Sequence, residues 1–111
     1  MSQDAGFESE GDTLRLHGGL DLATVAGLWS SSQRLFESTQ PPARVDVSAV
    51  DRVDSAGVAL LVQWVGMARA RGVALRVEGM SPAMGDLIAL ADLEPLLPVV
   101  DDQTARQREN P

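Results

Sequence analysis

The residue of this sequence best placed to bind a ligand or a partner is Ser55, which follows Asp54 where a short strand runs into a long apolar helix. The first N–H groups of a helix lack intrahelical partners and carry the positive end of its dipole. A phosphate, a sulfate or a partner's carboxylate would therefore be stabilised beside Ser55. A simpler interpretation is capping, in which the side chain of Asp54 or Ser55 only accepts a hydrogen bond from one of these N–H groups.

Three carboxylates surround the same turn, and they raise the alternative of a small magnesium-dependent enzyme. Asp46, Asp51 and Asp54 fall within nine residues, and carboxylate oxygens are ligands that Mg²⁺ accepts. Acidic residues are common at strand ends and helix caps, however, so we expect that no metal binds here. The only histidine, His17, lies on the polar side of an early strand, far in sequence from Ser55. Neither Gly-rich phosphate-binding motif occurs, so we expect no catalytic residue and no cofactor.

The helix that begins at Ser55 is apolar on almost every side. On a helical wheel its core stripe comprises Val58, Leu61, Val62 and Val65, which places Leu60, Trp64 and Met67 on the flank or the far side. Either a neighbouring segment covers these flanking residues, or they form a docking face, where exposed Trp and Met are typical anchors. Trp29, at the edge of an earlier apolar stripe, poses the same question. Leu60, Trp64 and Trp29 are therefore candidate partner-binding residues.

Periodicity and turn residues predict the remaining elements. Alternating apolar and polar residues predict strands, and apolar residues at helical spacing predict helices. The expected N-caps are Asp21 and Ser81, and the expected helix stops are Pro41-Pro42 and Gly72. This order indicates an α/β sandwich, a mixed sheet of about five strands with three or so helices packed on one face. The expected strands are 7–10, 12–17, 43–47, 73–78 and 96–100. The expected helices start at Leu22, at Ser55 (ending at Arg71) and at Pro82. The third helix is expected to bury Met84, Leu87, Ile88, Ala91 and Leu93.

Length and composition describe one acidic domain. The 111 residues contain 16 Asp and Glu against nine Arg, for a net charge of −7, which disfavours nucleic acid as a partner. No apolar run is long enough to span a bilayer, and the polar start lacks an export signal, so we expect a cytoplasmic protein. Residues 7–100 are the expected domain, between flexible ends at 1–6 and 101–111.

Three segments together resemble the STAS domain, the module of sulfate transporters and anti-sigma-factor antagonists. They are Gly-Leu-Asp at 19–21, Val-Asp-Val-Ser at 45–48 and Val-Asp-Ser-Ala-Gly-Val-Ala-Leu-Leu at 53–61. The resemblance spans about residues 7–100. It implies the sandwich described above, and it implies regulation through protein contacts instead of catalysis.

Within the family the chain looks most like the cytoplasmic STAS subunits of Mla phospholipid ABC transporters. These subunits bind the transporter ATPase, support its assembly and activity, and help to keep the outer membrane asymmetric, so the subunit could lie at the inner membrane through its partner. Carried onto this chain, the resemblance implies an ATPase-binding patch with Trp29 and Ser55, in which Asp54, Ala56 and Gly57 shape the turn.

Ser55 itself fits a second branch equally well, since the Mla branch often has Thr at this position. In anti-sigma-factor antagonists the matching Ser accepts phosphate from a partner kinase, and this modification breaks the complex. The added charge, about −1.5 to −2, next to Asp54 would repel an acidic partner surface. The sequence therefore predicts a non-enzymatic regulatory subunit that binds a transporter ATPase, with an anti-sigma-factor antagonist switched at Ser55 as the alternative.

Overall fold

The strands form one mixed sheet that follows the order of the chain. The computed structural model describes residues 5–90 and 99–100. Its five strands are arranged in the order β1-β2-β3-β4-β5. β1 and β2 form an antiparallel hairpin, whereas β2, β3, β4 and β5 are parallel. The strands are β1 (Ala5–Glu10), β2 (Thr13–Leu20), β3 (Arg44–Val53), β4 (Arg76–Glu78) and β5 (Val99–Val100).

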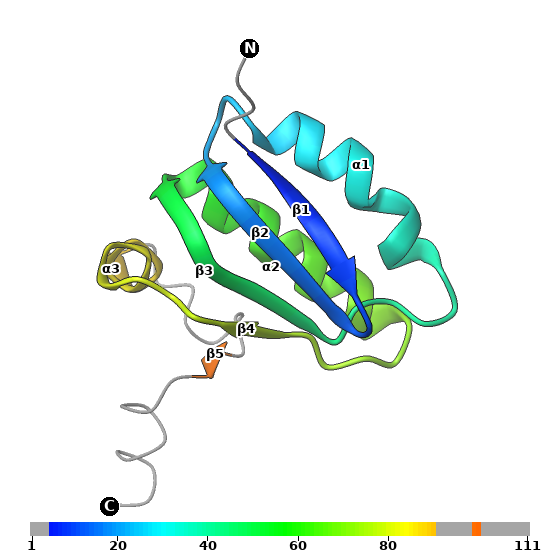
Figure 1. Cartoon of the computed structure of the whole chain (residues 1–111). Coiled ribbons are helices and arrows are strands. Elements are labelled where there is room, and N and C mark those ends of the chain that lie inside the picture. The colour runs from blue at the N-terminus through cyan, green and yellow to red at the C-terminus, as the bar shows by residue number, and fades with distance from the viewer. Residues whose placement is uncertain (1–4, 91–98, 101–111) are drawn as a thin grey trace, which may run out of the picture.

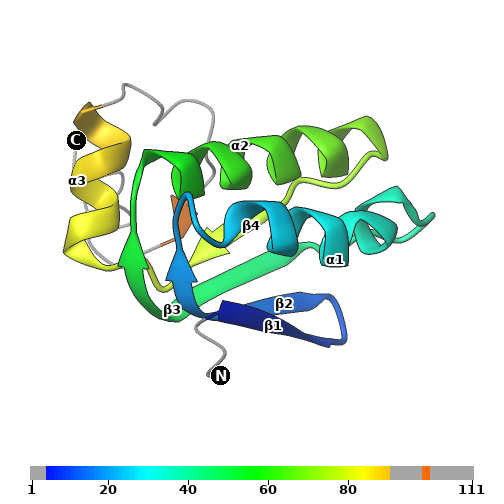
Figure 2. The same cartoon turned by 90° about the horizontal axis from the view of Figure 1, so that it is seen from above.

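Two helices cover one face of this sheet. Figures 1 and 2 show α1 (Val25–Glu37) and α2 (Ser55–Ala70) side by side on that face, while α3 (Pro82–Leu90) lies at the edge of the layer near one end of α2. The predicted α/β sandwich, with a mixed sheet and helices on one face, is thus confirmed. None of the helices in residues 5–90 has the length and hydropathy that a membrane span requires.

The starts of α2 and α3 and the end of α2 lie close to their predicted positions, whereas the start of α1 differs. Asp54 is the N-cap of α2, and the Ser81 hydroxyl caps α3 by accepting the Met84 N–H at 3.2 Å. Gly72 follows α2 with a φ of 82°, a left-handed conformation that a residue without Cβ adopts at little cost. α1 begins at Val25 instead of Leu22, and its N-cap is Thr24 instead of the predicted Asp21. Residues 22–24 form a turn in which the Asp21 carbonyl accepts the N–H groups of Thr24 and Val25, both at 3.0 Å.

The central strands are longer than their sequence pattern indicates. β2 was expected to end at 17 and β3 at 47, but their parallel pairing continues as far as Leu20 opposite Val53. Register shifts between Arg15 and His17 and between Gly18 and Gly19 break the alternation that marks a strand in the sequence. β4, in contrast, begins only at Arg76, three residues after the expected start.

Some predictions lie at or beyond the limits of the described residues. β1 begins at Ala5, two residues before the expected domain start. The strand expected over 96–100 is described only as β5, at its last two residues. Residues 91 and 93, predicted to continue the third helix inward, lie outside the described residues, as do 1–4 and 101–111.

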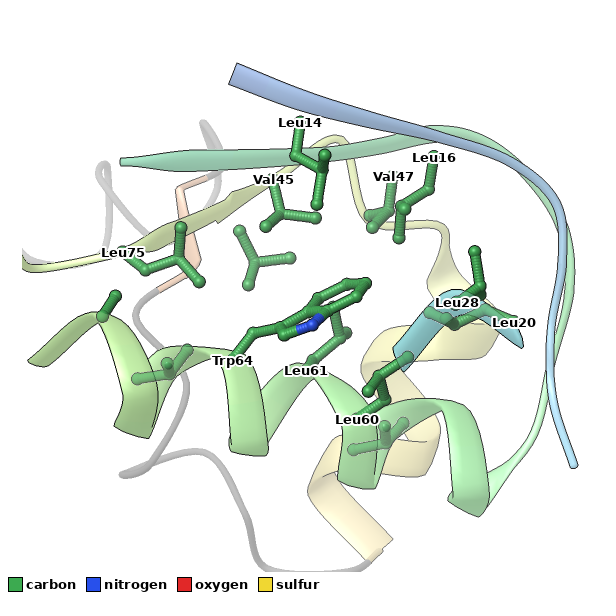
Figure 3. Close-up of a cluster of buried hydrophobic side chains, with 14 of the residues drawn as sticks. Leu14, Leu16, Leu20, Leu28, Val45, Val47, Leu60, Leu61, Trp64 and Leu75 are labelled. Carbon is green, nitrogen blue, oxygen red and sulfur yellow. The ribbon is translucent and has the colours of Figure 1, made fainter. Parts of the chain in front are cut away.

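Trp64 lies at the centre of the hydrophobic core, so a neighbouring segment covers this flank of α2, and the prediction of Trp64 as a partner-binding residue is wrong. Its side chain is 0% exposed, its ring stacks on Phe36 at a centroid distance of 5.4 Å, and its Nε1–H donates to the Ser32 hydroxyl at 3.0 Å. The predicted stripe is rotated, because α1 supplies both of these contacts and covers the flank of α2. Figure 3 shows Trp64 between α2 and the side chains of β2 and β3. Leu60, on the same flank, is 7% exposed.

Gly57 allows the first turn of α2 to lie directly against the end of β2. A Cβ at this position would overlap the carbonyl oxygen of Leu20, which is backbone and cannot turn away. The same carbonyl accepts the Asp54 N–H at 3.2 Å, so the strand end and the helix start are joined at two neighbouring points. Gly57 is therefore required by close packing instead of by a special φ.

Replacing Ser32 with Ala should lower the free energy of unfolding by about 1–3 kcal/mol, because the Trp64 N–H would stay buried without an acceptor. The same change in a Trp64→Phe background should cost clearly less, since no N–H remains there to satisfy. Urea denaturation followed by circular dichroism measures both differences. Equal costs in the two backgrounds would show that the hydrogen bond does not stabilise the core.

Gly57→Ala should destabilise the protein by about 1–3 kcal/mol or more, because the added methyl group forces α2 away from Leu20. Gly66→Ala is the matched control on the same helix, where a Cβ meets nothing within 4 Å. That change should stabilise the protein by about 0.5–1 kcal/mol through helix propensity. Thermal unfolding of both variants tests the contrast, and a neutral Gly57→Ala would contradict the close approach.

Candidate docking site at the amino ends of α1 and α2

Asp54 joins the start of α2 to the loop between β2 and α1. One carboxylate oxygen accepts the N–H groups of Ala56 and Gly57 at 2.9 and 3.1 Å, which confirms the capping interpretation for Asp54. The other oxygen accepts the Leu22 N–H at 3.0 Å. The Leu22 N–H, followed by those of Gly57 and Ala56, holds the pKa of Asp54 below its ordinary value, against the opposing effect of desolvation. The group is therefore a carboxylate at neutral pH.

The loop that Asp54 holds is braced by further hydrogen bonds of its own. The Thr24 hydroxyl donates to the Gly19 carbonyl at 2.9 Å, and the Asp21 carboxylate accepts the Ala23 N–H at 3.0 Å. At the tip of this loop the Leu22 side chain is 75% exposed. The sequence analysis missed Leu22 as a surface residue, because its spacing to Val25 placed it in the apolar stripe of a helix.

Ser55 is the first residue of α2 and is exposed. Since Asp54 serves as the cap, the Ser55 hydroxyl is not committed to that role. Earlier in the same turn, the Arg52 guanidinium lies 3.5 Å from a carboxylate oxygen of Asp21 and 3.5 Å from one of Asp51. The exposed Ser55 hydroxyl thus follows, in the chain, a cluster of two carboxylates and one guanidinium.

An open apolar groove lies between the amino-terminal halves of α1 and α2. Its volume is about 350 Å³, and Trp29, a half-buried residue that also packs on the core, forms part of its wall. Of the predicted contact residues, Trp29, Ala56 and Leu60 line this groove, whereas the buried Trp64 does not. The lining residues are Val25, Ala26, Trp29, Ala56, Ala59, Leu60 and Gln63.

The three carboxylates considered for a metal do not converge on one point. The Asp46 carboxylate accepts the Ser48 N–H at 2.9 Å, which is the largest of the effects that lower its pKa. Asp51 pairs with Arg52, and Asp54 caps α2. Within the described ranges, 5–90 and 99–100, no group of three or more potential metal ligands occurs. The magnesium-enzyme alternative therefore has no supporting geometry in this part of the chain.

Solved structures with this fold include antagonists of anti-sigma factors. An anti-sigma-factor antagonist domain from Planctomyces limnophilus matches with a TM-score of 0.69 and 15% identity, covering 93% of this chain and 95% of that one. The Bacillus protein SpoIIAA matches in its phosphorylated form with a TM-score of 0.63 and 17% identity, covering 96% and 99% of the two chains. At these identities the matches establish the shared fold.

Sequence comparison gives a closer relationship. The intermembrane phospholipid transport system binding protein MlaB of Escherichia coli K12 is 31% identical over 93 residues, which cover 84% of this chain and 93% of that protein. MlaB of Shigella flexneri matches equally well. The family model for the Mlab-type STAS domain matches residues 4–98. The chain therefore belongs to the STAS domain family, and within it to the MlaB-like members.

Proposed function

We propose that this protein is a non-enzymatic regulatory subunit that binds the cytoplasmic ATPase of an Mla-type phospholipid ABC transporter. In this role it supports the assembly and activity of the transporter, which maintains the lipid asymmetry of the outer membrane. The 31% identity to a binding protein of an intermembrane phospholipid transport system supports the pathway. The open apolar groove supports the mode of action, because it offers an apolar surface on which a protein can dock.

The surface around the groove has the composition of an interface centre. α1 carries no charged residue before Arg34, and α2 carries none before Arg69, although the outer faces of solvated helices are usually charged. Protein interfaces are depleted of charge at their centres and enriched in aromatic residues such as Trp29. Exposed Leu22 extends this apolar surface beyond the end of the groove.

The same surface is rigid before any partner arrives. Asp54 ties the Leu22 loop to α2, and the core fixes the two helices on the sheet. A preorganised surface loses little conformational entropy when it binds, so more of its contact energy appears as affinity. This favours a constitutive subunit of an assembly, whose contacts need no prior rearrangement.

Co-purification with the candidate ATPase of an Mla-type transporter tests the proposal. Trp29→Ala and Ser55→Glu should each weaken the complex by about tenfold or more, because one removes an anchor and the other places a charge at the groove. Ser31→Glu is the matched control for charge. Ser31 is two residues after Trp29, so its side chain is about 200° around α1 from that of Trp29 and faces away from the groove.

Trp29 also contacts the core, so the thermal stability of its variant must be compared with that of wild type before its binding is interpreted. Wild-type affinity in both variants would contradict the proposed face. A complex weakened as much by Ser31→Glu as by Ser55→Glu would indicate a general effect of added charge.

The exposed Ser55 hydroxyl supports one second candidate, an anti-sigma-factor antagonist that a kinase switches at this residue. The lower identities to the antagonist structures, 15% and 17%, make it the weaker candidate beside the 31% identity to MlaB. The two functions differ in one measurable product. Incubation with ATP and the cognate anti-sigma kinase should produce phosphoserine at position 55, detected by mass spectrometry, only if the antagonist function is correct.

A further inference from the structure

An arginine on the sheet face opposite the helices lies across a glycine and points toward the loop between β2 and α1. Arg52 and Gly19 are partners in the parallel pairing of β3 with β2. Leu20 points into the core, so by strand alternation Gly19 and Arg52 face the other side of the sheet. A Cβ added at Gly19 would lie 2.6 Å from a guanidinium nitrogen of Arg52. The missing side chain at Gly19 therefore leaves the space in which Arg52 lies.

From this position the Arg52 guanidinium contacts Asp21, the first residue after β2. Its Nε lies 3.5 Å from Oδ2 of Asp21, while Oδ1 of the same carboxylate accepts the Ala23 N–H at 3.0 Å. The Asp21 side chain is only 19% exposed, and a carboxylate so far removed from water needs a cation or hydrogen-bond donors beside it. One carboxylate thus joins the backbone of the loop to an arginine of the sheet.

The loop is held at two neighbouring points by residues from one short segment, 52–54. Arg52 contacts the Asp21 side chain, and the Asp54 carboxylate accepts the Leu22 N–H at 3.0 Å. Figure 1 shows the carboxyl ends of β2 and β3 side by side, where β2 leads into this loop and β3 into α2. The hydrogen bond from Ala23 to Asp21 spans Leu22, so these contacts fix the backbone on both sides of Leu22 and orient its exposed side chain.

We infer that Arg52 is a positioning residue of the docking site, although it lies on the opposite face of the sheet from the groove. By holding the Asp21 carboxylate, it keeps the exposed Leu22 side chain in the orientation in which the partner ATPase receives it. This inference rests on the proposed function and adds a residue that affects binding without touching the partner. A side chain that is oriented before binding loses less conformational freedom in the complex, so Arg52 increases affinity through preorganisation.

Amide hydrogen exchange in the free protein tests the positioning step without any partner. Arg52→Gln keeps a long polar side chain without the charge, and it should speed exchange of the Ala23 N–H by about two- to fivefold. Arg52→Lys retains a cation near Asp21 and should restore much of the protection. Arg15→Gln is the matched control, because exposed Arg15 faces the same side of the sheet and pairs with Glu10 at 3.3 Å. Unchanged exchange at Ala23 in Arg52→Gln would overturn the positioning role.

Affinity measurements with the candidate ATPase show whether Arg52 acts through Leu22. Arg52→Gln should weaken the complex by about two- to fivefold, and Leu22→Ala should weaken it by about fivefold or more. In a Leu22→Ala background, the change at Arg52 should have almost no further effect, because no anchor remains to be oriented. Arg15→Gln should leave the affinity at the wild-type value.

Two outcomes separate this inference from the proposed function. Fully additive losses at Arg52 and Leu22 would overturn the positioning role, because they would indicate that Arg52 acts independently of Leu22, and the proposed function would stay intact. If the wild-type protein did not bind the ATPase at all, the proposed function would fail, and this inference would fail with it.

Discussion

The contact between the first turn of α2 and the end of β2 is the constraint on which the rest of this structure depends. The Leu20 carbonyl accepts the Asp54 N–H and lies against Gly57, where any side chain would overlap it. The Asp54 carboxylate accepts two N–H groups of its own helix and one from the Leu22 loop. A single short segment, Asp-Ser-Ala-Gly, therefore caps a helix, seats it on the sheet and fixes the neighbouring loop. The serine is left exposed because the aspartate has taken the capping role.

The close packing of α2 on the sheet also explains why buried residues extend so far around this helix. The sheet covers one side of the helix and α1 covers the flank, so the buried arc includes Trp64 as well as Val58, Leu61 and Val65. The Ser32 hydroxyl accepts from the Trp64 indole and donates to the carbonyl of Trp29 at 3.3 Å. One buried hydroxyl thus connects the centre of the core with the backbone of a groove residue. The position of the groove wall follows from core packing, which is why we treat the surface as preformed.

The sequence predicted those features that local chemistry determines. The helix stop at Gly72 and the caps at Asp54 and Ser81 could be inferred because each depends on a few neighbouring residues. The mixed sheet could be inferred from the order of strands and helices along the chain. Features set by distant segments could not. The extension of β2 and β3 depends on pairing across register shifts, and the burial of Trp64 depends on where α1 packs. Of the candidate site, the turn and Trp29 were identified, whereas Leu22 was missed, because its spacing to Val25 fits a helix that in the structure begins only at Val25.

The distribution of charge gives an independent reason to regard the helical side as the binding side. The sheet face that α1 and α2 leave uncovered carries ion pairs, with Arg15 and Glu10 at 3.3 Å and Arg44 and Glu78 at 3.9 Å. The amino halves of both helices carry no charge, although the whole chain has a net charge of −7. The net charge of the protein is thus concentrated away from this one exposed surface, as expected of a surface that a partner covers, which favours the proposed docking there. Ser55 directly precedes the groove residue Ala56 and follows the charged turn, so a single charge added there should weaken the proposed contact.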